Sequence, residues 1–263
     1  MLRTPNAFMS VIAVLISAIL VSFYAPFQLA ISCLVVFLIS GAGMVINDYF
    51  DYDADRINRP KRALPSGKIY RKSALIYSIT LFVIGNVLAY FLNFQMLAIV
   101  LFNTLLSIIY SWKLKKMALV GNFAVSWMTA SVFLFGSLLS GGIGATAFIL
   151  FIISFLSSVG REITKAIEDV EGDLKIKART LPIIAGKNFS SWIAAFFIIF
   201  AVLFSPLPYM FRLLNINYVF LVTIADALFL YSCFAIMISP KKAQKMMKVA
   251  MFIGLIAFLA GNL

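Results

Sequence analysis

The segment LVVFLISGAGMVINDYFDYDAD, residues 34–55, passes without interruption from a long apolar run into four aspartates. A second segment, FILFIISFLSSVGREITKAIEDVEGD at 148–173, repeats this order of an apolar run followed by acidic residues. Together the two segments hold nine of the ten Asp and Glu residues of the chain. Apolar runs of this kind are typical of helices that cross a membrane, so we expect the acids to gather at a membrane surface.

The composition of the whole chain agrees with a membrane protein. Of its 263 residues, 63% are hydrophobic and only 12% are charged, with a mean hydropathy of +1.02, which excludes an ordinary water-soluble globule. A helix of about 20 apolar residues crosses about 30 Å of hydrocarbon. Nine apolar runs therefore predict an all-α integral membrane bundle of nine transmembrane helices, forming a single domain over 1–263, with spans at 8–24, 27–46, 73–92, 95–112, 121–140, 144–160, 189–207, 217–238 and 247–263.

The distribution of basic residues predicts the orientation of this bundle. Lys and Arg accumulate in short loops on the cytoplasmic side of a membrane. With the N-terminus inside, nine spans place 21 of the 22 Lys and Arg residues on the cytoplasmic side and only Arg212 on the other. We therefore expect a multi-pass cell-membrane protein with a cytoplasmic N-terminus, an outer C-terminus and both acidic segments on the cytoplasmic side. The first run is expected to be retained, since no small-residue cleavage site follows it.

Several other chemistries are disfavoured. The net charge of +12 is divided among short interhelical loops with no recognisable nucleic-acid-binding module, so we expect no nucleic acid partner. The 240–248 region is expected to attract anionic lipid headgroups. His is absent, which excludes imidazole as base, nucleophile or ligand, and Cys33 and Cys233 lie in apolar runs without a metal-binding spacing.

Both acidic segments show helical spacing. If the second helix continues past Asn47, then Asn47, Asp51 and Asp55 share one face at i, i+4 and i+8, with Asp48 beside them. Asp53 points away from that face. If the sixth helix continues in the same way, a second face carries Arg161, Lys165, Asp169 and Asp173, with Glu162 alongside.

Oxygen ligands without imidazole or thiolate favour a hard cation such as Mg²⁺, whose coordination is usually completed by phosphates and water. A bare carboxylate cluster would repel both itself and a phosphate, so metal ions and nearby cations are needed. A solvated acidic loop that merely balances basic neighbours is the alternative at this stage. The nearby cations are Arg59, Lys61, Arg62, Lys115, Lys116, Arg161, Lys165 and Arg179.

A basic loop with Pro and Gly follows each acidic segment, RINRPKRALPSG at 56–67 and KIKARTLPIIAGK at 175–187. Each half of the chain thus reads as helix, acidic face and basic loop, which hints at an old duplication. We expect the first loop to be ordered over the site.

These motifs, with RTPN at 3–6, YSWKLKK at 110–116 and GN at 121–122, resemble the UbiA superfamily of intramembrane prenyltransferases. The first signature of that superfamily, Asn-xxx-Asp-xxx-Asp, matches Asn47, Asp51 and Asp55. The second, Asp-xxx-Asp, matches Asp169 and Asp173. The resemblance extends over most of the chain. It departs at Leu114 and Lys115, where many aromatic prenyltransferases have a Lys-Arg pair.

The resemblance implies a bundle around a cavity that opens to lipid, in which both Asp motifs bind Mg²⁺ and an isoprenyl diphosphate. As catalytic and metal-binding residues it implies Asn47, Asp51, Asp55, Asp169 and Asp173. The prenyl group would leave its diphosphate as an allylic carbocation and be captured by an acceptor nucleophile in a dry pocket. The expected substrate contacts are Arg3, Asn6, Asp48, Arg62, Tyr110, Lys115, Arg161 and Lys165.

The IEDVEGD segment and the ARTLP loop are most similar to the digeranylgeranylglyceryl phosphate synthases of archaeal ether-lipid synthesis. The implied reaction moves a geranylgeranyl group from its diphosphate to the hydroxyl of geranylgeranylglyceryl phosphate, a lipid-like acceptor. An aromatic, quinone-type or chlorophyll-type acceptor is the second hypothesis. A membrane transporter or lipid-binding protein is the hypothesis from another class. Transporters usually place ionisable residues near the bilayer midplane, whereas here both acidic faces fall at helix ends.

Overall fold

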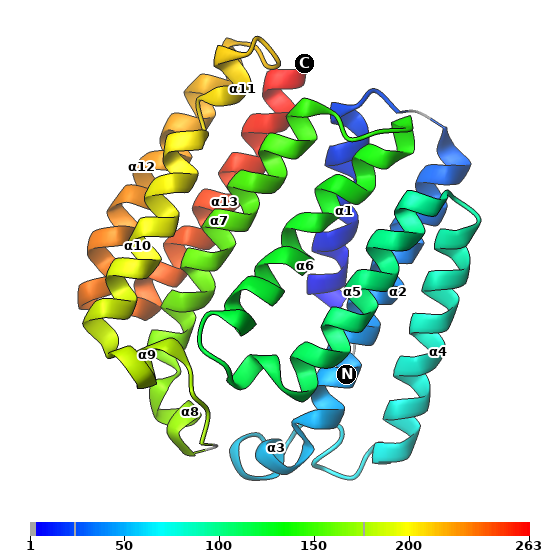
Figure 1. Cartoon of the computed structure of the whole chain (residues 1–263), viewed down its shortest axis with the longest axis vertical. Coiled ribbons are helices and arrows are strands. Elements are labelled where there is room, and N and C mark those ends of the chain that lie inside the picture. Colours follow the sequence, from blue (N-terminus) through cyan, green and yellow to red (C-terminus); the bar gives the residue numbers. More distant parts are fainter. Residues whose placement is uncertain (1–3, 24, 176) are drawn as a thin grey trace.

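The computed structural model describes residues 4–23, 25–175 and 177–263, without the side chains of residues 4–6, 54, 57 and 58. Within these limits the chain is a bundle of long helices with short helices at its two ends (Figure 1). The long helices are α1 (Thr4–Leu20), α2 (Pro26–Phe50), α4 (Arg71–Tyr90), α5 (Phe94–Trp112), α6 (Val120–Ser137), α7 (Ala145–Glu168), α10 (Lys187–Phe204), α12 (Ile216–Ile238) and α13 (Pro240–Asn262).

The short elements cap the ends of the bundle. The helices α3 (Tyr52–Asn58), α8 (Val170–Lys175) and α9 (Leu181–Ala185) lie at the lower end in Figure 1, and α11 (Leu207–Met210) lies at the upper end. Short 3₁₀ turns at Leu114–Lys116 and Leu138–Ser140 border α6.

Each of the nine predicted spans falls on one long helix of the described chain. Eight of these helices are long and apolar enough to cross a membrane, and α1 contributes the shorter apolar stretch Ala7–Leu20. Two helices extend well beyond the predicted runs. Helix α7 continues through charged residues to Glu168, and α13 begins at Pro240 because proline is well tolerated in a first helical turn. The chain is a multi-pass integral membrane protein.

Close packing between neighbouring helices holds the bundle together. Helix α12 packs along α13, α7 packs against both α6 and α10, and α2 packs against α4. Glycine permits some of these approaches: a Cβ at Gly160 of α7 would lie 2.9 Å from the carbonyl oxygen of Ala194 in α10. Small residues at such contacts are typical of membrane helices, which associate by van der Waals packing.

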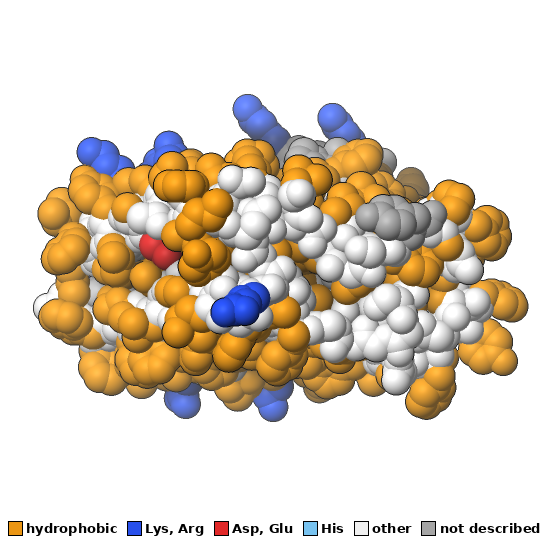
Figure 2. Space-filling model, turned by 90° about the horizontal axis from the view of Figure 1, so that it is seen from above, with side chains coloured by type: hydrophobic (Ala, Val, Ile, Leu, Met, Phe, Trp, Pro, Cys, Tyr) orange, Lys and Arg blue, Asp and Glu red, His pale blue; other side chains and the backbone are white. Residues whose placement is uncertain are grey.

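The two ends of the bundle differ in charge. Both acidic segments and the loops that follow them lie at the lower end in Figure 1, with α3 and α8. Figure 2 looks onto the opposite end and shows mainly hydrophobic and uncharged side chains. This separation matches the distribution of charge along the sequence.

The contact between Gly261 and Tyr218 yields a test of the packing. A Cβ at Gly261 would lie 2.5 Å from the Cβ of Tyr218, whose side chain is fully buried, whereas a Cβ at Gly254 of the same helix meets open space. We expect Gly261→Ala to destabilise the protein by about 1–3 kcal/mol through overpacking. Gly254→Ala should be neutral or should stabilise it by up to about 1 kcal/mol, since alanine is the better helix former. Thermal unfolding in detergent measures both, and equal midpoints for the two variants would contradict the packing described.

Candidate active site

Each acidic segment lies where a long helix breaks before a short one. Asp51 separates α2 from α3 with φ −83° and ψ 1°, and Asp169 separates α7 from α8 with φ −87° and ψ 3°. The helices therefore do not continue uninterrupted, the condition under which the spacing was considered, because a ψ near 0° leaves the helical range and Asp competes for backbone hydrogen bonds. The i+4 spacing persists, since the N–H of Asp55 donates to the Asp51 carbonyl (2.7 Å) and that of Asp173 to the Asp169 carbonyl (3.0 Å).

The first segment is bound to the turn after α5. Lys115 Nζ lies 2.5 Å from Asp51 Oδ1 and 3.4 Å from Asn47 Oδ1. The amide nitrogen of Asn47 in turn donates to Asp51 Oδ2 at 2.8 Å. The three side chains thus form one hydrogen-bonded group, which includes the residue that differs from the Lys-Arg pattern of aromatic prenyltransferases.

Arg62 neutralises the rest of this segment from the following loop. Its guanidinium donates to Asp55 Oδ2 at 2.5 Å and lies 3.5 Å from Asp48 Oδ1. Both carboxylates are buried, whereas Asp53 is exposed. The loop therefore lies over the acids, as its composition predicted, and buried carboxylates of this kind need such a partner.

The second segment has a different pattern of pairing. Glu162, buried in α7, lies 2.8 Å from Arg161 and 3.5 Å from Lys165. Asp169 is exposed and Asp173 is half-buried. No Lys or Arg of the described residues lies within ion-pair distance of either aspartate.

Partial burial raises the pKa of Asp173. The nearby Asp169 carboxylate adds to this rise in the pKa, whereas Thr180 and Lys165 oppose it. Asp173 is therefore close to Asp169 and to Lys165, which lies one helical turn before Asp169. These neighbours place the second aspartate pair next to the Glu162 group.

Tyr110 connects the two segments. Its side chain, near the end of α5, lines the same cavity as Asn47 of the first segment and Glu162 of the second. The backbone brings the surrounding loops together as well, because the N–H of Arg179 donates to the carbonyl oxygen of Lys116 at 2.8 Å. The structure thus brings both acidic segments to one place, although they are more than a hundred residues apart in the chain.

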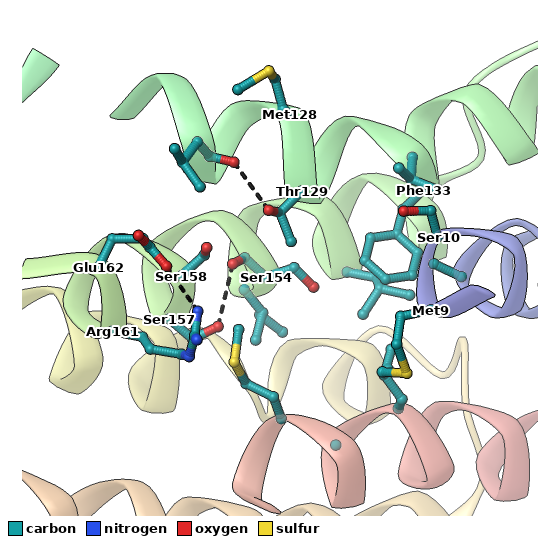
Figure 3. A pocket seen from close by; sticks show the side chains of 18 of the residues that line it. Met9, Ser10, Met128, Thr129, Phe133, Ser154, Ser157, Ser158, Arg161 and Glu162 are labelled. Carbon is teal, nitrogen blue, oxygen red and sulfur yellow. Dashed lines mark hydrogen bonds and ion pairs between the residues drawn. The ribbon is translucent and has the colours of Figure 1, made fainter. Parts of the chain in front are cut away.

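A cavity of about 790 Å³ extends from this place into the bundle. Asn47, Tyr110, Arg161, Glu162 and Lys165 line it at the acidic end of the molecule, and apolar side chains of eight long helices line most of the remainder. Figure 3 shows Arg161 and Glu162 at one end of a wall that carries several hydroxyl groups and continues to apolar side chains. Its labelled residues are Met9, Ser10, Met128, Thr129, Phe133, Ser154, Ser157, Ser158, Arg161 and Glu162.

The donor set suits a hard cation, although no three acidic, His or Cys side chains of the described residues form a ready-made metal cluster. On the first segment the carboxylate oxygens of Asp51 and Asp55 already bind Lys115 and Arg62. On the second segment, Asp169 and Asp173 have carboxylates without a paired cation among the described residues. Carboxylate and amide oxygens from Asn47, Asp51 and these two aspartates are ligands that Mg²⁺ prefers.

Not every residue predicted for the site is placed there by the described structure. Arg3 is outside the described residues. The backbone of Asn6 belongs to α1, but its side chain is not described. Four of the cations expected to surround the acids have exposed side chains and form no ion pair with a described acid: Arg59, Lys61, Lys116 and Arg179.

The cavity also contains charged residues that the sequence did not assign to a site. Lys248, two turns into α13, lines it, although 240–248 was expected to be a loop at the lipid headgroups. Asp226 lies near the middle of α12, lines the cavity, and accepts a hydrogen bond from Ser205 Oγ at 2.5 Å. The sequence did offer a signal for Asp226, because it is the only acid inside an apolar run. It offered none for Lys248, which looks like the three lysines that precede it in the chain.

Known proteins resemble the chain over most of its length. Residues 7–256 match the UbiA prenyltransferase family. The chain is 44% identical over 231 residues to a digeranylgeranylglyceryl phosphate synthase of Methanosarcina mazei, covering 87% of this chain and 80% of the relative. It is 40% identical over 267 residues to a protein of the same name from Methanosphaera stadtmanae, covering 100% of this chain and 97% of the relative.

Solved structures share the fold. One reported for digeranylgeranylglyceryl phosphate synthase in membranes superposes with a TM-score of 0.88 at 38% identity, covering 99% of this chain and 95% of the other. A UbiA homologue from Archaeoglobus fulgidus bound to GPP and Mg²⁺ has a TM-score of 0.73 at 16% identity, covering 99% and 98%. The second structure supports the fold alone, and it contains a prenyl diphosphate together with Mg²⁺.

The geometry predicts that Mg²⁺ and inorganic diphosphate together raise the thermal stability of the protein. Binding to the folded state at a hundredfold excess over Kd stabilises a protein by about 3 kcal/mol. We expect this rise in thermal stability for the wild type, and its loss in Asp51→Asn and Asp169→Asn, because each change removes one carboxylate from the converging set. Thermal unfolding in detergent measures it.

Asp53→Asn is the matched control, since it removes the same charge two residues from Asp51 on an exposed side chain. This variant should keep the full stabilisation. Equal loss in Asp53→Asn would mean that only the total charge of the segment matters, and the proposed ligand set would then be wrong.

Proposed function

The chain belongs to the UbiA prenyltransferase family, and we propose that it joins geranylgeranyl diphosphate to the free hydroxyl of geranylgeranylglyceryl phosphate. This is the reaction of digeranylgeranylglyceryl phosphate synthase in archaeal ether-lipid synthesis. The observation that carries the proposal is the identity of about 40% along the full chain to synthases of that name. The site described above supplies the groups that this reaction requires.

The acidic end of the cavity is the proposed donor site. Asn47, Asp51, Asp55, Asp169 and Asp173 would hold Mg²⁺, with Arg62 beside Asp55 and Lys115 beside Asp51. Mg²⁺ bound there neutralises the diphosphate and makes it a better leaving group. Lys115, close to Asn47 and Asp51, adds a fixed positive charge where negative charge develops on the departing oxygen.

The cavity wall accounts for the next step. When the allylic C–O bond breaks, its electron pair leaves with the diphosphate and the prenyl carbon becomes electron-deficient. The acceptor hydroxyl oxygen then bonds to that carbon and releases its proton to a base at the cavity mouth. Mostly apolar side chains exclude water, which would otherwise capture the cation. No His is available for the proton, so a carboxylate or the departing diphosphate takes it.

The placement in the membrane follows from charge. We propose that the acidic end faces the cytoplasm, because 21 of 22 Lys and Arg residues belong to that side in a nine-span topology. The N-terminus would then be cytoplasmic, and the cavity would open to lipid so that the tails of both substrates enter from the bilayer.

Two alternatives are less well supported. An aromatic or chlorophyll-type acceptor would not need a further cationic group, whereas Arg161 and Lys165 lie at the cavity mouth. A transporter would place ionisable groups at mid-span, and Asp226 does lie there, but it accepts a hydrogen bond from Ser205 while the other described acids lie at the acidic end.

A transfer assay tests the function. Membranes with the protein, radiolabelled geranylgeranyl diphosphate and Mg²⁺ receive geranylgeranylglyceryl phosphate or 4-hydroxybenzoate in separate reactions. We expect product only with the glycerol phosphate, and losses of about 10²–10³-fold in Asp51→Asn and Asp169→Asn, the range typical for removing one preorganised charge-stabilising group. EDTA should abolish transfer.

Asp53→Asn again serves as control and should retain wild-type activity. Product with 4-hydroxybenzoate alone would overturn the choice of acceptor but keep the donor site. Unchanged transfer in Asp51→Asn would overturn the proposed role of the first acidic segment.

A further inference from the structure

The charged residues that line the cavity are unequally distributed between its walls. Toward the acidic end of the molecule, α7 contributes Arg161, Glu162 and Lys165, and α13 contributes Lys248. Three cations against one carboxylate give this side a net charge of about +2. The first acidic segment contributes the uncharged Asn47 to the lining, and its aspartates, two of which pair with Arg62 and Lys115, do not line the cavity.

Arg161 has one N–H donor that no described residue accepts. One terminal nitrogen pairs with Glu162 at 2.8 Å, whereas the Nε–H is buried and has no hydrogen-bond partner among the described residues. A buried donor without an acceptor is costly, and such groups in native proteins usually have a ligand or water as partner. The guanidinium fork suits two oxygens of a carboxylate or phosphate.

Lys248 is an unexpected cation in the same cavity. It lies two turns inside α13, which packs against α7, and no acid of the described residues lies within ion-pair distance of it. Lys241, Lys242 and Lys245 of the same helix do not line the cavity. A lysine ammonium on its flexible stem is a mobile point charge that can follow an anion.

Lys248 also lies where the cavity is accessible from outside. Met9 of α1 and Phe252 of α13 line the cavity, yet 46% and 54% of their surfaces are exposed. Lys248 itself also lines the cavity and is exposed. An entrance between α1 and α13 would account for these three residues. An amphiphile could enter there with its tail in lipid and its head beside Lys248.

We propose that Arg161, Lys165 and Lys248 form a metal-independent site for the phosphate monoester of the prenyl acceptor, which enters between α1 and α13. The proposal rests on the function proposed above and adds the location of the acceptor headgroup. A phosphate monoester carries a charge of about −1.5 to −2 near neutral pH, which matches the net charge of this wall. The donor diphosphate, by contrast, meets carboxylates and needs Mg²⁺.

The first experiment compares two variants of one helix. Lys248→Gln removes the cavity-lining cation, and Lys245→Gln removes an exposed cation that does not line the cavity. We expect Lys248→Gln to raise the KM for geranylgeranylglyceryl phosphate about ten- to a hundredfold, the effect of losing one hydrogen bond to a charged group. The KM for geranylgeranyl diphosphate should change less than twofold, and Lys245→Gln should behave as wild type.

The second experiment measures binding without turnover. In EDTA, geranylgeranylglyceryl phosphate should still bind the purified wild-type protein, and Lys248→Gln should bind it at least tenfold more weakly. Geranylgeranylglycerol, which lacks the phosphate, should bind both proteins equally. Binding that requires Mg²⁺, or that is unchanged in Lys248→Gln, overturns the site. Binding as proposed without transfer in the presence of Mg²⁺ would overturn the proposed function while supporting the site.

A lipid headgroup offers the same phosphate chemistry, so the bilayer must be varied. Nanodiscs of phosphatidylcholine alone and of phosphatidylcholine with phosphatidylglycerol distinguish binding of the acceptor phosphate from binding of an anionic lipid headgroup. If Lys248 binds the acceptor, the loss in Lys248→Gln appears in both lipid mixtures. A loss confined to the anionic mixture, and equal for geranylgeranylglycerol, would assign Lys248 to bilayer lipid and overturn the proposal.

Discussion

Carboxylates crowded at the end of a membrane helix are stable only when cations lie among them, and the rest of this site depends on that constraint. Lys115 bridges Asp51 and Asn47, and Arg62 bridges Asp55 and Asp48. Each cation belongs to a different loop, so charge neutralisation also fixes the turn after α5 and the loop after α3 over the cavity. The same ion pairs therefore neutralise the carboxylates and hold the two loops in place.

The second acidic segment has the same backbone conformation as the first, but different acids in it pair with cations. Both segments break at their first aspartate with nearly the same φ and ψ, and both restore the helical hydrogen bond four residues later. This similarity supports the duplication that the sequence suggested. Within the described part of the chain, only the first segment pairs its motif aspartates with cations, whereas in the second the cations pair with Glu162. The second pair of aspartates thus has the carboxylates most available to a metal ion.

Hydropathy and helical spacing predicted most of the fold, since a span needs only length and apolar content. They placed the start of α13 too late, because its four lysines make the first turns of the helix resemble a loop. They also missed the breaks at Asp51 and Asp169, which depend on the ψ of single residues. The approach of Tyr110 to Glu162, and of Lys248 to the cavity, depends on how distant helices pack, which no local pattern encodes.

Two substrates that both carry phosphate must approach one reaction centre without repelling each other. The cavity resolves this conflict if its two walls use different chemistry. The aspartates of the two acidic segments, at the end of the bundle beyond Asn47 and Glu162, would favour a diphosphate only through a divalent metal, while Arg161 and Lys248 inside the cavity would favour a lone phosphate directly. Glu162 lies between these regions and is paired with cations on its own helix. Its negative charge would discourage the acceptor phosphate from moving toward the metal, which leaves the acceptor hydroxyl as the group that reaches the prenyl carbon.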